Sequence, residues 1–347
     1  MERVIERVEL APDYSVSRVI KGGWQLSEGH SATVSDDPVS DMFEFVERGI
    51  DTFDCADIYT GVEEMIGRFN VANRRRNRHL PVRIHTKYVP DYDALGQLTR
   101  ENVEMIIDRS LQRLQMERLD MVQFHWWNYA APGWVEAASW LAELQAQGKI
   151  HLISLTNFNT EKTLEILEAG VSLATTQVQY SLLDPRPEKL LADVCRKYTM
   201  QMLCYGSLAG GFLSDAWLGR SDPEALDNRS LIKYRLMIEE IGGWDLFQEL
   251  LATLKRIADK HGTSIATVAS RWVLDQPAVA AVIIGSRNAK HVDRYRELFE
   301  LKLDDFDREV IATLRSQMHT PELDVFDLER DKSGRHGRIM KYNLNAE

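Results

Sequence analysis

Three features are scarce in this chain of 347 residues: cysteines, long apolar runs and an excess of basic charge. Its cysteines, Cys55, Cys195 and Cys204, stand apart and form no C-x-x-C pair, which argues against a disulfide framework or a zinc ribbon. The formal net charge of −11 argues against nucleic acid as a partner, because proteins that bind its backbone carry a basic face. No apolar run approaches membrane-spanning length, and the N-terminal stretch MERVIERVEL is too charged for a signal peptide. We therefore expect a soluble, cytoplasmic protein with no membrane partner.

The sequence alternates short apolar runs with longer segments of helical period. Hydrophobic residues make up 44% of the chain, which is enough for a large core. Eight such runs with helices between them favour a parallel (β/α)8 barrel of the TIM type over an open sheet, preceded by an N-terminal hairpin from Val8 to Val16. Residues 1–347 are expected to form one barrel domain. The runs are RVIKGG near 18, the run ending at 54, VRIHTK near 82, DMVQFHW near 120, IHLISLTN near 150, ATTQVQY near 174, MQMLCYG near 200 and AVAAVIIG near 278.

Two stretches interrupt this alternation. The connection that follows the seventh strand, residues 206–243, is far longer than a usual loop of a barrel, and loops of that length tend to be functional lids or clamps. The tail, residues 317–347, has no helical period. The sequence leaves open whether this tail covers the barrel mouth or lies in solvent.

Polar residues follow the apolar runs at many separate places, and in a parallel barrel these strand ends meet on one face. Asp54, Lys87 and His125 end three of the runs, and Tyr59 lies five positions beyond Asp54. A half-buried Lys87 needs a carboxylate partner, for which Asp54 is the candidate. A cation beside Tyr59 would favour its phenolate, and His125 could hold a substrate oxygen. The four residues together predict a proton-transfer site without an activated nucleophile.

Each of these residues also has an ordinary structural interpretation. Asp54 alone could be a turn or cap residue, Lys87 a solvated charge, His125 a buried core residue and Tyr59 a packing residue of a loop. Their joint placement at strand ends favours the functional interpretation. A glycosidase pair of Asp54 and Asp57 is disfavoured, because two residues three positions apart on one turn cannot flank a sugar bond. The sequence has no G-x-S-x-G, P-loop or H-E-x-x-H motif.

With these residues in place, the chain resembles the aldo-keto reductase superfamily from about Val16 to Leu314. The potassium-channel β-subunit and bacterial reductase side of that superfamily is the more similar branch. The motifs that carry the resemblance are KGGWQL, GIDTFDCADIYTGVEEMIG, IHTK, SLQRLQMERLDMVQFHW, GKIHLISLTNF, QVQYSLL, CYGSLAGGFL and ASRWVLDQPAVAAVIIGSRN.

The resemblance implies NAD(P)H-dependent reduction of an aldehyde or ketone, with a small-molecule carbonyl substrate and no metal. Asp54, Tyr59, Lys87 and His125 match the catalytic residues of the family. Tyr59 would donate the proton, Lys87 would depress its pKa, Asp54 would pair with Lys87, and His125 would orient the carbonyl. The cofactor residues implied by the match are Gly23, Trp24, Asp54, Thr156, Asn157, Gln177, Tyr205, Gly206, Ser207, Leu208, Gly210, Arg229, Gly285, Ser286, Arg287 and His291.

The adenosine end departs from the family pattern. Ser286, Arg287 and His291 occupy matching positions, but Arg294 and Tyr295 stand where the family has a Glu-Asn pair for the adenine. The positive charge here, with Arg229, favours NADP(H) over NAD(H), although NAD(H) stays possible.

Aromatic residues Trp24, Tyr88 and Trp126, with Trp127, are expected around the carbonyl. Neighbouring strand positions point in opposite directions, so at most one of Trp126 and Trp127 would face the substrate. Two alternatives to a carbonyl reductase stay open: an NADPH-bound regulatory or redox-sensing subunit with little turnover, and a sugar (aldose) dehydrogenase that works in the oxidising direction. The oligomeric state cannot be read from the sequence.

Overall fold

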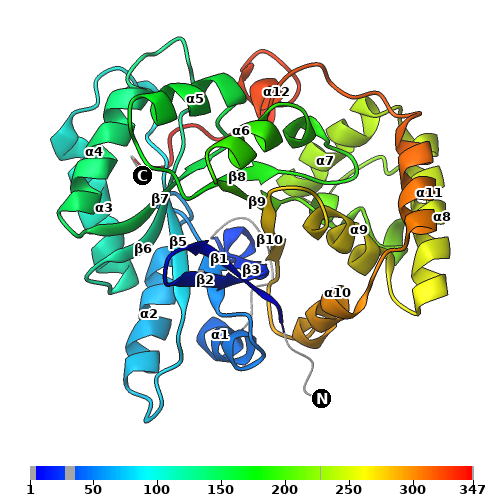
Figure 1. The fold of residues 1–347 in the computed structure, drawn as a ribbon, viewed down its shortest axis with the longest axis horizontal. Helices are drawn as coiled ribbons and strands as arrows, with labels where there is room; N and C mark the ends of the chain where they lie inside the picture. The colour runs from blue at the N-terminus through cyan, green and yellow to red at the C-terminus, as the bar shows by residue number, and fades with distance from the viewer. Residues whose placement is uncertain (1–4, 28–35, 227, 346–347) are drawn as a thin grey trace.

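A computed structural model describes residues 5–27, 36–226 and 228–345, and its centre is a closed parallel barrel in the order β10-β3-β4-β5-β6-β7-β8-β9 (Figure 1). All eight predicted strands and the predicted (β/α)8 fold are confirmed. The strands are β3 (Val19–Gly22), β4 (Thr52–Asp54), β5 (Arg83–Tyr88), β6 (Leu119–Phe124), β7 (Ile150–Thr156), β8 (Thr175–Gln179), β9 (Gln201–Tyr205) and β10 (Val279–Gly285).

The barrel strands are almost wholly buried, because helices cover their outer faces and side chains fill the interior. That double burial explains why they read as continuous apolar runs rather than alternating ones. The register of the strands then determines which residues lie level with one another at the site. Gly22 pairs with Asp54, and Thr156 pairs with Gln177, so these residues stand level at the carboxyl end of the barrel.

The predicted N-terminal hairpin is present as β1 (Arg7–Ala11) and β2 (Tyr14–Ser17). It lies across the amino end of the barrel, dark blue in Figure 1, where Leu10, Tyr14 and Val16 pack against residues of the barrel interior. The hydroxyl of Tyr14 lies 3.1 Å from Nε2 of the buried His85. The hairpin therefore closes the barrel end opposite to the strand ends that carry the predicted site.

Helices alternate with the strands, and their ends agree with the sequence signals. Thr99 caps α3 through a capping box with Asn102, and Gly148 follows α4 with a φ of +86°. The helices are α1 (Pro38–Glu47), α2 (Val62–Arg74), α3 (Arg100–Leu114), α4 (Trp134–Ala146), α5 (Thr160–Glu168), α6 (Leu191–Lys197), α7 (Arg229–Glu240), α8 (Trp244–His261), α9 (Ile265–Leu274), α10 (Glu297–Glu300), α11 (Asp305–Arg315) and α12 (Asp327–Arg330). None of the helices in the described ranges is long and apolar enough to cross a membrane.

The two interrupting stretches are both more structured than the sequence indicates. The connection after β9 contains α7, which packs against the residues 209–211 at its start. The tail leaves α11, forms the short helix α12 and continues to the end of the described chain, red in Figure 1. Tyr92 donates a backbone hydrogen bond to Tyr342 of the tail, and Asn345 bonds to Asp57 and Val89. The tail thus lies against the barrel, which the sequence left open.

Candidate active site

A cavity of about 710 Å³ opens at the carboxyl ends of the strands, and it contains the predicted proton-transfer residues. Its wall is drawn from all eight strand ends or the loops after them, from the start of α7 and from the tail. The lining residues include Asp54, Tyr59, Lys87, His125, Thr156, Asn157, Gln177, Tyr205, Gly206, Ser207, Leu208, Gly210, Arg229, Gly285 and Arg287. Among the described residues, no group of three or more His, Cys, Asp or Glu side chains is placed to hold a metal ion.

A buried ion pair forms the floor of this cavity. Lys87 Nζ lies 2.6 Å from Asp54 Oδ2 and donates a second hydrogen bond of 2.8 Å to the carbonyl of Cys55. The other carboxylate oxygen of Asp54 accepts bonds of 2.7 Å from the amide nitrogens of Gln123 and Gln177. We call Asp54, Lys87, Gln123 and Gln177 the Asp54 cluster. Its charges balance and both carboxylate oxygens of Asp54 accept hydrogen bonds, which a buried ion pair requires. The predicted Asp54–Lys87 contact is confirmed.

Gln123 was missed by the sequence analysis, because a glutamine inside an apolar run gives no chemical signal. Gln177 uses both amide hydrogens inside the protein, one to Asp54 and one to the Gln123 oxygen at 2.7 Å. Only its carbonyl oxygen is left for a ligand. A carboxamide bound there would donate its N–H to Gln177.

Tyr59 meets the Asp54 cluster through Lys87. The Lys87 ammonium lies 5.1 Å from the centre of the phenol ring. Burial raises the pKa of Tyr59, while the charge of Lys87 opposes the rise. The predicted lowering effect of Lys87 on the pKa of Tyr59 is present, but burial outweighs it and the net shift is upward. The phenol stays protonated at neutral pH, which is the state that a proton donor needs.

His125 reaches the cavity from the end of β6. Its Nδ1 lies 3.0 Å from the carbonyl oxygen of Thr156, and since a carbonyl only accepts, the proton is on Nδ1. Burial and the charge of Arg330 lower the pKa of His125 to about 3, so the ring is neutral. Nε2 is then a hydrogen-bond acceptor, and it has no partner among the described residues. In this tautomer His125 can hold a substrate oxygen that carries a proton, but it cannot donate a hydrogen bond to a carbonyl oxygen.

The aromatic residues that line the cavity differ from those predicted from the sequence. Trp24 lines the cavity and packs on Tyr59 with ring centres 5.0 Å apart. Trp126 and Tyr88 do not line it: Trp126 is buried with its indole N–H bonded to Asn128 and Ala131, and Tyr88 stacks on Phe124. Their prediction as substrate residues is corrected to Trp127, which lines the cavity edge-on to His125 at 4.3 Å.

Residues of the tail complete this wall. Phe326, in a left-handed conformation with φ +62°, lies edge-on to His125 at 5.5 Å. Ile339, Met340, Lys341 and Leu344 also line the cavity. No periodic pattern marks these positions, so the sequence could not assign them.

The glycine-rich loop after β9 forms the next part of the wall. Gly206 and Gly210 have φ of +75° and +67°, and a Cβ on either would lie within 2.8 Å of Tyr234. Both positions therefore need glycine. Asn228, which caps α7, and Arg229 and Ser230 at its first turn also line the cavity.

The residues predicted to hold the adenosine end of the cofactor agree least well with the lining of the cavity. Gly285 and Arg287 line the cavity, whereas Gly23, Ser286 and His291 do not. The Ser286 hydroxyl bonds to the Asn288 carbonyl at 2.5 Å, Gly23 donates its N–H to the Asp54 carbonyl at 2.8 Å, and His291 is exposed. These three are corrected to supporting or surface positions in this structure.

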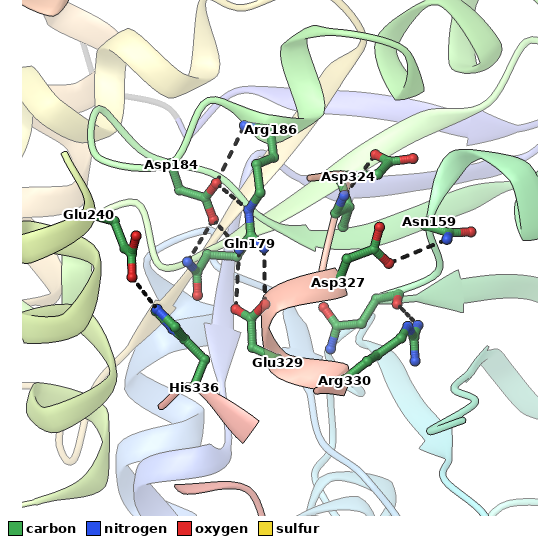
Figure 2. A network of polar contacts seen from close by, with 12 residues as sticks. Asn159, Gln179, Asp184, Arg186, Glu240, Asp324, Asp327, Glu329, Arg330 and His336 are labelled. Atoms are coloured by element: carbon green, nitrogen blue, oxygen red, sulfur yellow. Dashed lines mark hydrogen bonds and ion pairs between the residues drawn. The ribbon is translucent and has the colours of Figure 1, made fainter. Parts of the chain in front are cut away.

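A second set of buried charges lies next to the cavity, whose wall includes one of its members, Lys233; Figure 2 shows Asp184, Arg186 and Glu329. Arg186 bonds Asp184 at 2.8 Å and Glu329 of the tail at 3.0 Å, and Lys233 lies 3.6 Å from Glu329. We call Asp184, Arg186, Lys233 and Glu329 the Glu329 cluster. Burial and the charge of its partners act in opposite directions on Glu329, and the partners prevail, which lowers its pKa to about 2. The sequence analysis identified none of these four residues.

The fold and this site define the class of protein: a parallel barrel whose strand ends bring an acid, a lysine and a histidine together with a tyrosine of the loop after β4. Residues 18–316 match the model of the aldo/keto reductase family, and the chain belongs to that family. It is an oxidoreductase that acts on carbonyl compounds.

Individual relatives are distant. Flagellar radial spoke protein 5 of Chlamydomonas reinhardtii is 32% identical over 179 residues, which span 46% of this chain but only 34% of that protein. The chloroplastic pyridoxal reductase of Arabidopsis thaliana is 27% identical over 307 residues, 83% of this chain and 80% of the relative. A solved glycerol dehydrogenase of Gluconobacter oxydans superposes with a TM-score of 0.74 at 24% identity, over 90% of this chain and 95% of that one. This structural similarity supports the assignment of the barrel fold.

Proposed function

We propose that this protein reduces aldehydes or ketones to alcohols with NADPH, and that Tyr59 donates the proton. The observation that carries the proposal is the Lys87 ammonium, which lies 5.1 Å from the centre of the Tyr59 ring and 2.6 Å from Asp54 Oδ2 in the wall of a large cavity. A donor phenol beside a compensated cation suits a reaction that develops negative charge on a substrate oxygen.

The cavity residues fit a nicotinamide dinucleotide. The cavity is lined by five basic residues and by one carboxylate, that of Asp54, although the whole chain carries a charge of −11. The basic residues are Lys87, Arg229, Lys233, Arg287 and Lys341. The first turn of α7, whose residues Arg229 and Ser230 line the cavity, is a helix N-terminus of the kind that binds phosphates. The buried Thr156 Oγ1 in the same wall has no partner within the described residues. These features support an anionic ligand with polar groups at its buried end.

The chain's own residues then supply binding and the proton. A reduced nicotinamide, when bound, supplies the hydride that the carbonyl carbon accepts. Tyr59 transfers its proton to the carbonyl oxygen, so the alcohol forms and a phenolate is left. Lys87 stabilises that phenolate until solvent returns the proton, and the Asp54 cluster keeps Lys87 charged in a buried place.

The substrate end is lined mainly by Trp24, Ile58, Val89, Trp127 and Phe326. Such a wall suits apolar or aromatic carbonyl compounds. The name of the plant relative, a pyridoxal reductase, supports including an aromatic aldehyde among the substrates. We propose NADPH over NADH because Arg229 and Arg287 line the cavity at the end where a 2′-phosphate would bind.

The proposal is tested by following the absorbance of NADPH and of NADH with a panel of aldehydes that includes pyridoxal. Sustained turnover supports a reductase. Oxidation of one equivalent of cofactor, with no further turnover, would instead support the regulatory subunit. Tyr59→Phe should reduce turnover about 1,000-fold with NADPH affinity kept. Tyr198→Phe, a matched change at the end of α6, should leave turnover unaltered.

A second function, alcohol oxidation, is favoured by the tautomer of His125. With its proton bonded to Thr156, His125 can accept a hydrogen bond from an alcohol hydroxyl but cannot donate one to a carbonyl. A bound alcohol therefore satisfies Nε2, whereas a bound carbonyl leaves it unpaired. Measuring the reaction of NADP⁺ with aldoses and polyols tests this direction. A rate far below that of carbonyl reduction at equal saturation would contradict it.

A further inference from the structure

Arg330, the last residue of α12, reaches from the tail into the protein beneath the cavity wall. Its guanidinium donates hydrogen bonds to the backbone carbonyls of Trp126 and Asn157, and a further one of 3.2 Å to Trp127. It also donates to the hydroxyl of Tyr129 at 2.7 Å and lies 4.0 Å from the centre of that ring. One side chain from the tail thus joins the end of β6 to the end of β7.

The tail holds Arg330 there through bonds on either side of it. Its neighbour Glu329 is fully buried in the Glu329 cluster, and Asp327 accepts a bond of 3.3 Å from Asn159 (Figure 2). Asp324 accepts the backbone N–H of Thr160 at 2.7 Å. Figure 2 shows Glu329 and Arg330 on one short helix with their side chains directed to different partners. The position of Arg330 is therefore fixed by several independent contacts.

The carbonyls that Arg330 binds belong to the residues that carry the site. Trp126 directly follows His125, and His125 bonds in turn to the Thr156 carbonyl. Asn157 has a left-handed backbone with φ +60°, and its side-chain oxygen accepts the Tyr205 hydroxyl at 2.8 Å. A non-glycine residue needs outside support to hold that conformation, and a charged hydrogen bond to its carbonyl provides it.

We propose that Arg330 is a positioning residue of the active site, which orients His125 and Asn157 toward the nicotinamide end of the bound cofactor. This inference rests on the proposed function, since it gives the tail a part in the same reaction. Arg330 touches neither cofactor nor substrate in this account. It acts through the backbone of β6 and β7, and its cation also disfavours protonation of His125.

The test compares two ligands on Arg330→Met, which keeps an unbranched side chain and removes the charge and the donors. NADPH carries the nicotinamide, whereas adenosine 2′,5′-bisphosphate carries only the adenosine end. We expect Arg330→Met to weaken NADPH about ten-fold, to slow single-turnover hydride transfer about 100-fold, and to leave the bisphosphate affinity unchanged. Arg330→Lys should recover part of both losses, since one ammonium can reach fewer carbonyls.

Arg335→Met is the matched control, because Arg335 also lies in the tail but pairs with Glu239 at the surface. It should leave all three measurements unchanged. Equal losses for NADPH and the bisphosphate, or no loss for either, would overturn the inference. If Arg330→Met does not fold, Arg330→Lys alone must show the same difference between ligands. The binding comparison needs no turnover, so a wild-type protein that reduces no carbonyl defeats the proposed function while Arg330 is still tested.

Discussion

Two buried charge clusters lie near the same cavity, and they differ in how they take part in its wall. Three members of the Asp54 cluster, Asp54, Lys87 and Gln177, line the cavity, whereas of the Glu329 cluster Lys233 lines it. The Asp54 cluster is built from strand ends and presents Lys87 to Tyr59, which lies in the cavity wall. The Glu329 cluster joins the loop after β8, α7 and the tail, and its two acids and two cations balance one another. The comparison teaches that similar buried charges can serve chemistry in one place and hold a segment in the other.

Removing Arg186 should have the largest effect, and that effect should be on the stability of the fold. Arg186→Met leaves Asp184 and Glu329 buried with only Lys233 to compensate them, so we expect a loss of about 4 kcal/mol in the free energy of unfolding. Denaturant unfolding measures this loss. Arg196→Met, at an exposed pair with Asp193, should cost less than about 0.5 kcal/mol, and similar losses in both variants would contradict the account.

Removing Lys87 should affect chemistry more than stability. In Lys87→Met the Asp54 carboxylate keeps the amide donors of Gln123 and Gln177, but Tyr59 loses the cation that stabilises its phenolate. We expect turnover to fall about 1,000-fold, with a smaller loss of stability than in Arg186→Met. Unfolding curves and steady-state rates on the same preparations check both parts. The reverse order of stabilities would mean that the two clusters have been assigned the wrong roles.

Acid should weaken the Glu329 cluster. Its glutamate has a pKa of about 2 in the folded protein against an ordinary value of 4.5, so the stability it contributes is present above about pH 4.5 and is lost as the pH falls toward 2. The shift corresponds to roughly 3 kcal/mol. The slope of the unfolding free energy against pH reports the number of protons taken up on unfolding. Glu329→Gln should lower that number by about one over this interval. An unchanged slope would refute a depressed pKa at this position.

The smallest effect is expected at the exposed adenosine end. Arg287 lines the cavity there, and Arg287→Ala should weaken NADPH about ten-fold while NADH affinity changes little. Fluorescence titration with both cofactors measures the ratio. Equal losses would mean that Arg287 does not recognise a 2′-phosphate. A selective loss of NADPH affinity would support the view that buried residues carry the reaction and that exposed residues select the cofactor.

The proton-transfer residues, including the pair of Asp54 and Lys87, were largely predictable from the sequence, because parallel strands bring their carboxyl ends together wherever the apolar runs stop. Asp54, Lys87 and His125 each end such a run, and Tyr59 follows one. Gln123 was not predictable, since it lies inside a strand and only the closed barrel places it beside Asp54. The exchange of Trp126 for Trp127 has a similar origin: strand alternation limits the choice to one residue but does not select it.

The Glu329 cluster could not be predicted, because its contacts join distant parts of the chain without any local pattern. Arg186 and Glu329 are separated by 143 positions. Helix α7 lies within the connection that the sequence indicated only as a long loop, and α12 is a single turn without helical period. Burial of Glu329 follows from the tail's path over the barrel, which only the tertiary structure reveals.

The central claim is tested most directly by tracing the hydride and the proton donor together. NADPH labelled with deuterium at the transferred position of C4 is incubated with an aldehyde and either wild-type protein or Tyr59→Phe. The account predicts deuterium on the carbinol carbon of the alcohol from the wild type, and about 1,000-fold less labelled product from Tyr59→Phe at saturating cofactor. Labelled alcohol formed at similar rates by both proteins, or by neither, would contradict it.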